Sequence, residues 1–215
     1  MPPTPPAPPQ PAGASETTRD RIKAIAKDIY VLRGFDGFNF GEVAEAVATT
    51  RANIHHHFGG KRALMAEIVA EFADDAAART LRIWQDARFP DALGAQLDDL
   101  RRFYRRYNAA PGDRNVWSPL ARLRLDEPRL GTLARDALER TNAIYDRTLG
   151  DAVRRAIAAG ELRPDTPVAE VVRLLRMAIL SSPAMTQDTG SFDELEALFA
   201  ALEHTLLAAW GPPRP

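Results

Sequence analysis

The sequence predicts an all-α protein in which a small N-terminal helical domain precedes a larger helical bundle. Apolar residues recur three and four positions apart, as at Ile22, Ile25 and Ile29, and this is the period of an amphipathic helix. Proline and glycine separate the apolar segments, none of which alternates as a strand does. The expected divisions are a tail at residues 1–16, a three-helix domain at 17–62, a larger bundle at 63–210 and a second tail at 211–215.

Composition narrows the possible functions. The 215 residues include no cysteine, which excludes disulfides and thiolate catalysis. The net charge is −1, yet residues 17–62 hold eight basic and five acidic side chains, a local excess of +3. Positive charge therefore gathers in the N-terminal domain, as attraction to phosphates requires. Seven of the first thirteen residues are proline, which favours a disordered tail rather than a signal peptide.

The stretch Asn39–Lys61 predicts two short helices joined by a tight turn, with a Gly-Gly pair ending the second. The first helix would span Phe40–Val47 with Asn39 as its N-cap, and the second Arg51–Phe58 with Thr50 as its N-cap. Two helices in this arrangement are typical of a helix-turn-helix reader of DNA.

The outward side chains of the second helix are expected to contact DNA. Arg51 suits guanine, Asn53 suits adenine, and Ala52 is small enough to approach a thymine methyl. Thr50 can hold a phosphate beside the helix N-terminus, and Lys61 can bind a backbone phosphate. The candidate DNA-binding residues are Asn39, Thr50, Arg51, Ala52, Asn53, His55, His56 and Lys61.

These residues resemble the DNA-binding domain of the tetracycline-repressor-like (TetR) family of bacterial transcription regulators. The resemblance lies in the Gly34-Phe35 pair, the capped helix Asn39–Val47, and the run His55–Phe58 followed by Lys61. It covers residues 17–64, about 48 positions. Two positions depart from the pattern: the family usually has Tyr at the position of His55, and Gly in the turn at the position of Ala48.

The resemblance implies a cytoplasmic, sequence-specific transcriptional regulator, expected to be a repressor that a small organic effector releases from its operator. It also implies a homodimer on a palindromic operator of double-stranded DNA, paired through the last two helices, at about 167–185 and 192–210. Aromatic side chains with an arginine anchor are expected to line the effector site. The candidates are Trp84, Phe103, Tyr107, Trp117, Arg122, Tyr145 and Arg176.

Helix boundaries in the second domain follow the prolines and glycines. We expect the helices at about 61–87, 93–107, 115–125, 128–160, 167–183 and 192–210, with Pro128 beginning one and Pro183 breaking another.

Alternative interpretations remain open. A metal site at His55–His57 is less favoured than DNA contact, because successive helical residues point about 100° apart. A helical small-molecule-binding protein or enzyme that never contacts DNA is the competing class. No grouping of catalytic residues supports an enzyme, and we expect no cofactor, no metal and no membrane segment.

Overall fold

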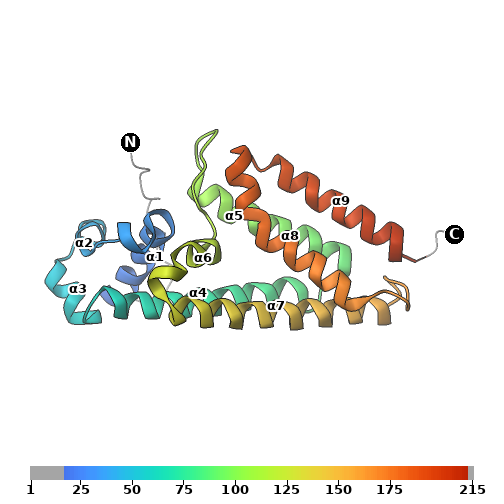
Figure 1. Cartoon of the computed structure of the whole chain (residues 1–215), viewed down its shortest axis with the longest axis horizontal. Helices are drawn as coiled ribbons and strands as arrows, with labels where there is room; N and C mark the ends of the chain where they lie inside the picture. The colour runs from blue at the N-terminus through green and yellow to red at the C-terminus, as the bar shows by residue number, and fades with distance from the viewer. Residues whose placement is uncertain (1–16, 213–215) are drawn as a thin grey trace. The chain divides into compact units, whose positions relative to one another are not determined.

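The computed structural model describes residues 17–212, so the expected tail at 1–16 and the last three residues of the tail expected at 211–215 lie outside the described residues. Within residues 17–212 there are nine α-helices and no strand, which confirms the all-α prediction (Figure 1). None of these helices is long and apolar enough to cross a membrane. The helices are α1 (Thr18–Gly37), α2 (Phe40–Val47), α3 (Arg51–Phe58), α4 (Lys61–Trp84), α5 (Phe89–Tyr107), α6 (Pro119–Leu130), α7 (Thr132–Ala158), α8 (Val168–Thr189) and α9 (Asp193–Trp210).

Packing divides the described chain into two compact units. Unit 1 consists of residues 17–73 and 116–138, and unit 2 of residues 74–115 and 139–212. The helices α4 and α7 each contribute residues to both units. The functional boundary expected near residue 62 stays a prediction, because a packing unit is not a functional domain.

The core of unit 1 holds α1, α2 and α3 together. Ile22, Val43 and Ile54, one from each helix, are fully buried, and burial of each such side chain contributes about 1.5–3 kcal/mol. On the outer side of α1, Arg19 pairs with Glu67 of α4 at 2.5 Å. Two α1 lysines, Lys23 and Lys27, both bond the Glu71 carboxylate of α4 at 2.6 Å. These three cations therefore attach α1 to α4 and are not simply solvated.

Gly34 interrupts α1, as expected, but the helix resumes and ends at Gly37. The interruption is possible because Gly34 has φ 69° and ψ −178°, a conformation that is essentially confined to glycine. α6 supplies hydrogen-bond partners there. The Arg122 guanidinium donates to the Val31 carbonyl at 2.9 Å, and the Asp126 carboxylate accepts the Phe35 N–H at 2.8 Å. An unbroken α-helix would join these two backbone groups to each other.

Two prolines lie inside helices, contrary to the expected boundaries. Pro128 is inside α6, and Gly131 separates α6 from α7. Pro183 lies within α8, which continues to Thr189. Around Pro183, the buried Ser182 hydroxyl donates to the Ala178 carbonyl at 2.7 Å, and the buried Thr186 hydroxyl donates to the Pro183 carbonyl at 3.1 Å. Proline has no N–H to donate to the Ile179 carbonyl one turn earlier, and α8 continues across this one missing bond.

Unit 2 is a helical bundle in which α9 packs against both α8 and α5 (Figure 1). Trp84 is fully buried, and its indole N–H donates to Gln96 at 3.0 Å, which satisfies the polar end of a large apolar side chain. The N-terminus of α5 receives its partner from the loop after α7, because the Glu161 carboxylate accepts the Phe89 N–H at 2.7 Å. A distant carboxylate thus replaces a local cap.

Candidate DNA-recognition surface

The two short helices have the caps that the sequence predicted. The Asn39 side-chain oxygen accepts the Glu42 N–H at 3.0 Å at the start of α2. The Thr50 hydroxyl accepts the Asn53 N–H at 3.1 Å at the start of α3. Each cap satisfies a first-turn donor that has no partner within its helix.

The turn between them passes through a left-handed residue. Ala48 has φ 57° and ψ 50°, and it is the only non-glycine residue of positive φ in the described chain. The Thr49 N–H donates to the Ala44 carbonyl at 2.8 Å, which closes α2 over that residue. Ala48 therefore adopts a conformation that glycine accepts without steric cost.

α3 divides cleanly into an inner and an outer face. Ile54 and Phe58 are buried among the helices of unit 1. Two of the eight predicted DNA-binding side chains, Asn53 and Lys61, are half-buried. The other six are exposed: Asn39, Thr50, Arg51, Ala52, His55 and His56.

Arg51 carries an uncompensated positive charge at the start of α3. Within residues 17–212 its guanidinium has no carboxylate partner. It lies against α2, so closely that a Cβ at Gly41 would collide with it. Gly41 thus leaves space for the arginine. An exposed, unpaired guanidinium can donate two parallel hydrogen bonds to an acceptor pair such as guanine O6 and N7.

Asn53 is the third residue of α3 and lies in its first turn. Its side-chain amide donates to the Thr49 hydroxyl at 2.9 Å, an interaction that sequence alone did not predict. The amide is thereby held in one orientation, and its oxygen is not used in that bond. Contact with an adenine edge, which needs one donor and one acceptor, would exchange the bond to Thr49.

His55 makes its contacts toward the C-terminal end of α3. Its Nδ1 lies 3.2 Å from the Gly59 carbonyl, and its ring meets Phe40 edge-on at 4.9 Å. Because a carbonyl only accepts hydrogen bonds, this contact requires the proton on Nδ1. The ring therefore closes the C-terminal end of α3 against α2, a role that the triple-histidine pattern did not indicate.

Lys61 follows the Gly-Gly pair and begins α4. Its ammonium lies 4.5 Å from the ring centre of Phe35 and 5.9 Å from that of Phe38. Cation–π contacts of this length hold a lysine in place without neutralising it. The aromatic residues that follow Gly34 thus position the lysine that closes the motif.

The predicted effector-binding residues are divided between the two units. Trp84, Tyr107 and Tyr145 are buried in unit 2, where Phe103 is half-buried. Arg176, also in unit 2, lines a cavity between α7 and α8. The other two residues, Trp117 and Arg122, belong to unit 1.

The positions of these seven residues do not test effector binding, so their effector-binding role stays a prediction. Arg122 already donates to the Val31 and Leu32 carbonyls, so its charge serves the end of α1. The Arg122 and Asp126 contacts join residues about 90 positions apart, and no short motif carries that information.

The fold and the capped, exposed α3 define a helix-turn-helix DNA-binding protein. Residues 23–68 match the family described as bacterial regulatory proteins, tetR family. A curated relative, the HTH-type transcriptional repressor KstR2 of Mycolicibacterium smegmatis, is 24% identical over 174 residues, which is 80% of this chain and 78% of the relative. Residues 23–68 thus form a helix-turn-helix similar to that of the tetR family, and the chain is a DNA-binding transcriptional regulator.

Solved structures share the fold over nearly the whole chain. Reduced NemR of E. coli superposes with a TM-score of 0.72 at 17% identity, covering 87% of this chain and 95% of NemR. A TetR transcriptional regulator from Chloroflexus aurantiacus gives a TM-score of 0.72 at 18% identity, covering 91% of this chain and 97% of that one. The bundle after the helix-turn-helix therefore has the fold of these proteins as well.

Proposed function

We propose that α3 reads base edges in the major groove and that its neighbours bind phosphates. The observation that carries this proposal is the exposed Arg51, which has no carboxylate partner in the described chain. Arg51 would bond guanine, Asn53 adenine, and Ala52 would approach a thymine methyl. Thr50, Asn39, His55, His56 and Lys61 surround these base readers and would meet the backbone.

We further propose that the protein acts as a homodimer on a palindromic operator. A single reading helix contacts too few base pairs for useful specificity, and two-fold symmetry doubles the site. On α8, Leu174 and Met177 are 46% and 54% exposed, although both are large and apolar. On α9 the exposed residues include five alanines, which allow close helix packing: Ala197, Ala200, Ala201, Ala208 and Ala209. These faces would pair with their copies.

We also propose that the protein represses transcription in the cytoplasm and that a small effector releases it from its operator. The curated relative KstR2 is named a repressor, which supports this direction. An effector acts only if it binds one arrangement of the protein better than another. Arg122 and Asp126 connect α6 to α1 by hydrogen bonds. We therefore propose that Arg122 couples effector binding to the helix-turn-helix. Trp84, Phe103, Tyr107, Trp117, Tyr145 and Arg176 remain the proposed effector contacts.

A gel-shift titration with a random-sequence duplex tests DNA binding against the competing class. A DNA-binding protein should shift the duplex at about 50 mM salt and lose affinity steeply by about 200 mM, because phosphate binding releases counterions. A helical small-molecule-binding protein or enzyme would leave the duplex unshifted at both concentrations, and that result would defeat the proposal.

A further inference from the structure

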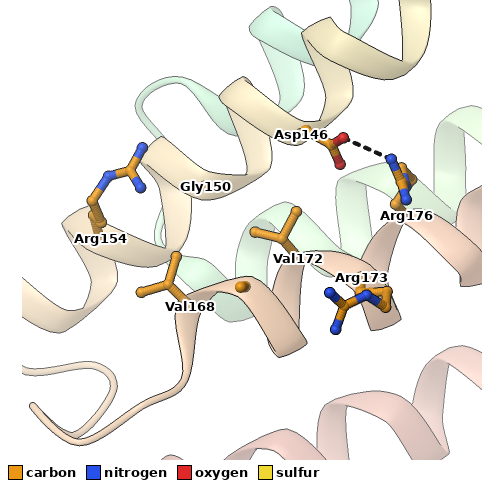
Figure 2. A pocket seen from close by; sticks show the side chains of 8 residues that line it. Asp146, Gly150, Arg154, Val168, Val172, Arg173 and Arg176 are labelled. Atoms are coloured by element: carbon orange, nitrogen blue, oxygen red, sulfur yellow. Dashed lines mark hydrogen bonds and ion pairs between the residues drawn. The ribbon is translucent and has the colours of Figure 1, made fainter. Parts of the chain in front are cut away.

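A cavity between α7 and α8 of unit 2 combines positive charge with an apolar wall. Its volume is about 440 Å³, within the range of about 300–1,000 Å³ that is typical of small-molecule sites. Figure 2 shows its lining residues, which are Asp146, Gly150 and Arg154 of α7 and Val168, Ala169, Val172, Arg173 and Arg176 of α8. Three arginines face one aspartate, a formal excess of two positive charges.

The three arginines differ in what already binds them. Arg154 pairs with Asp151 at 2.7 Å, a contact exposed on both sides. Arg176 donates through Nη1 to Asp146 at 2.6 Å (Figure 2), while its Nε is buried and has no partner. Arg173 is exposed and has no ion pair or hydrogen bond within the described part of the chain.

Unused guanidinium donors favour an oxyanion. Arg176 Nε is buried and not accessible to a ligand, so an oxyanion would bond the remaining guanidinium N–H groups of Arg176 together with those of Arg173. Carboxylate and phosphate groups also match the planar fork of arginine.

Backbone groups add to the same preference. Val168 and Ala169 form the first turn of α8, and no side chain caps that end. The first N–H groups of a helix have no partner within it, and they favour negative charge nearby. The arginines are the main determinant of the preference for an anion, and the N-terminus of α8 adds to it.

The cavity also has a wall that suits an apolar group. The Val168 and Val172 side chains point toward α7 in Figure 2, and Gly150 is buried on the facing helix. An aliphatic portion of a ligand would lie on these valines while its charged end meets the arginines.

We propose that this cavity binds an amphiphilic organic anion, with a carboxylate or phosphate head at Arg173 and Arg176 and a short aliphatic part on Val168 and Val172. The site lies within unit 2, whereas α3 belongs to unit 1. Because Arg176 is also one of the proposed effector contacts, the inference deepens the effector part of the proposed function. Its occupancy can be measured without DNA, so its failure is distinguishable from a failure of DNA binding by α3.

Isothermal titration calorimetry of the full chain tests the site with four probes. Hexyl phosphate and hexanoate carry the two possible heads on one tail, inorganic phosphate lacks the tail, and hexyltrimethylammonium reverses the charge. We expect at least one of the hexyl anions to bind, inorganic phosphate to bind at least tenfold more weakly, and the cation not to bind. The tighter of the hexyl anions identifies the head group.

The variant Arg173→Gln locates the binding. Arg173 is exposed and has no ion pair or hydrogen bond in the described chain, so this variant should fold normally and weaken the tighter anion by on the order of tenfold. Arg147→Gln, which removes an exposed arginine of α7 outside the cavity, is the matched control and should bind as the wild type does. The proposal is overturned if neither hexyl anion binds at millimolar concentration, if inorganic phosphate or the cation binds equally well, or if Arg173→Gln changes nothing.

Discussion

The Asp126 carboxylate of α6 accepts the backbone N–H of Phe35 at 2.8 Å, immediately after the left-handed Gly34. A Cβ at Gly34 would lie 3.2 Å from both Asp126 carboxylate oxygens and 3.1 Å from the Arg122 guanidinium. The glycine thus permits both the change of direction in α1 and the close approach of α6. This contact fixes the end of α1, the first helix of the DNA-binding domain.

The variant Asp126→Ala should therefore destabilise the protein. It leaves the half-buried Phe35 N–H without its acceptor, which costs about 1–3 kcal/mol. Urea denaturation followed by circular dichroism measures the change. Arg129→Ala is the control, because its ion pair with Asp36 has both side chains more than 60% exposed and such pairs contribute about 0–1 kcal/mol. Equal loss of stability in both variants would contradict a special role for Asp126.

Ala48→Gly should stabilise the protein. A non-glycine residue in the left-handed region costs about 1–2 kcal/mol, and the greater freedom of glycine in the unfolded chain offsets about 0.4–1 kcal/mol of that gain. We expect a net increase of roughly 0.5–1 kcal/mol in the free energy of unfolding, measured by chemical denaturation. Ala46→Gly, at an exposed position in the last turn of α2, should instead destabilise by up to about 1 kcal/mol. An Ala48→Gly protein weaker than the wild type would show that the turn is not strained.

Glu71 should make stability depend on pH. Partial burial acts to raise its pKa, but hydrogen bonds from Lys23 and Lys27 outweigh this and hold the pKa of Glu71 below its ordinary value of 4.5. Its stabilising effect is therefore complete above pH 4.5 and is lost as pH falls through the lower folded-state pKa. Glu71→Gln should be less stable at pH 7 and show a smaller loss on acidification. Parallel stability–pH curves for the two proteins would refute this.

DNA contacts should separate into base readers and phosphate binders. Once an operator is known, Arg51→Ala should cost about 1–3 kcal/mol on it and relax sequence preference. Lys61→Ala should weaken all DNA about equally and reduce the salt slope by about 1. Fluorescence anisotropy at several salt concentrations distinguishes the two effects. Arg140→Ala, an exposed arginine of α7, should alter neither, and a similar effect there would point to general charge alone.

The dimer proposal predicts that Met177→Glu yields a monomer. Two copies of the variant would place like charges together in an apolar interface, where unpaired charge is costly. Sedimentation velocity at micromolar concentration should show a dimer for the wild type and a monomer for the variant. Glu170→Gln, a polar change at an exposed position of α8, should remain dimeric. A wild-type protein that sediments as a monomer would contradict the proposal outright.

Local chemistry determined which features were predictable from the sequence. The caps Asn39 and Thr50 and the limits of α2 and α3 were predicted correctly, because capping depends on residues three positions apart. The proline boundaries were wrong where helix context outweighed proline. α8 continues past Pro183 at the cost of one missing backbone bond, to the Ile179 carbonyl. The candidate site was harder to predict. The Asp126–Phe35 bond joins residues 91 positions apart, and the Asn53–Thr49 bond, although local, is one of several that an asparagine side chain can make.

Selection of bound duplexes from a random DNA pool tests the central claim most directly. Two copies of α3, related by two-fold symmetry, should enrich a palindromic consensus whose half-sites lie about one helical turn apart. The Arg51→Ala protein should lose enrichment at one position of each half-site. A wild-type pool that retains no consensus after repeated rounds would contradict the account, because the exposed side chains of α3 would then not read sequence.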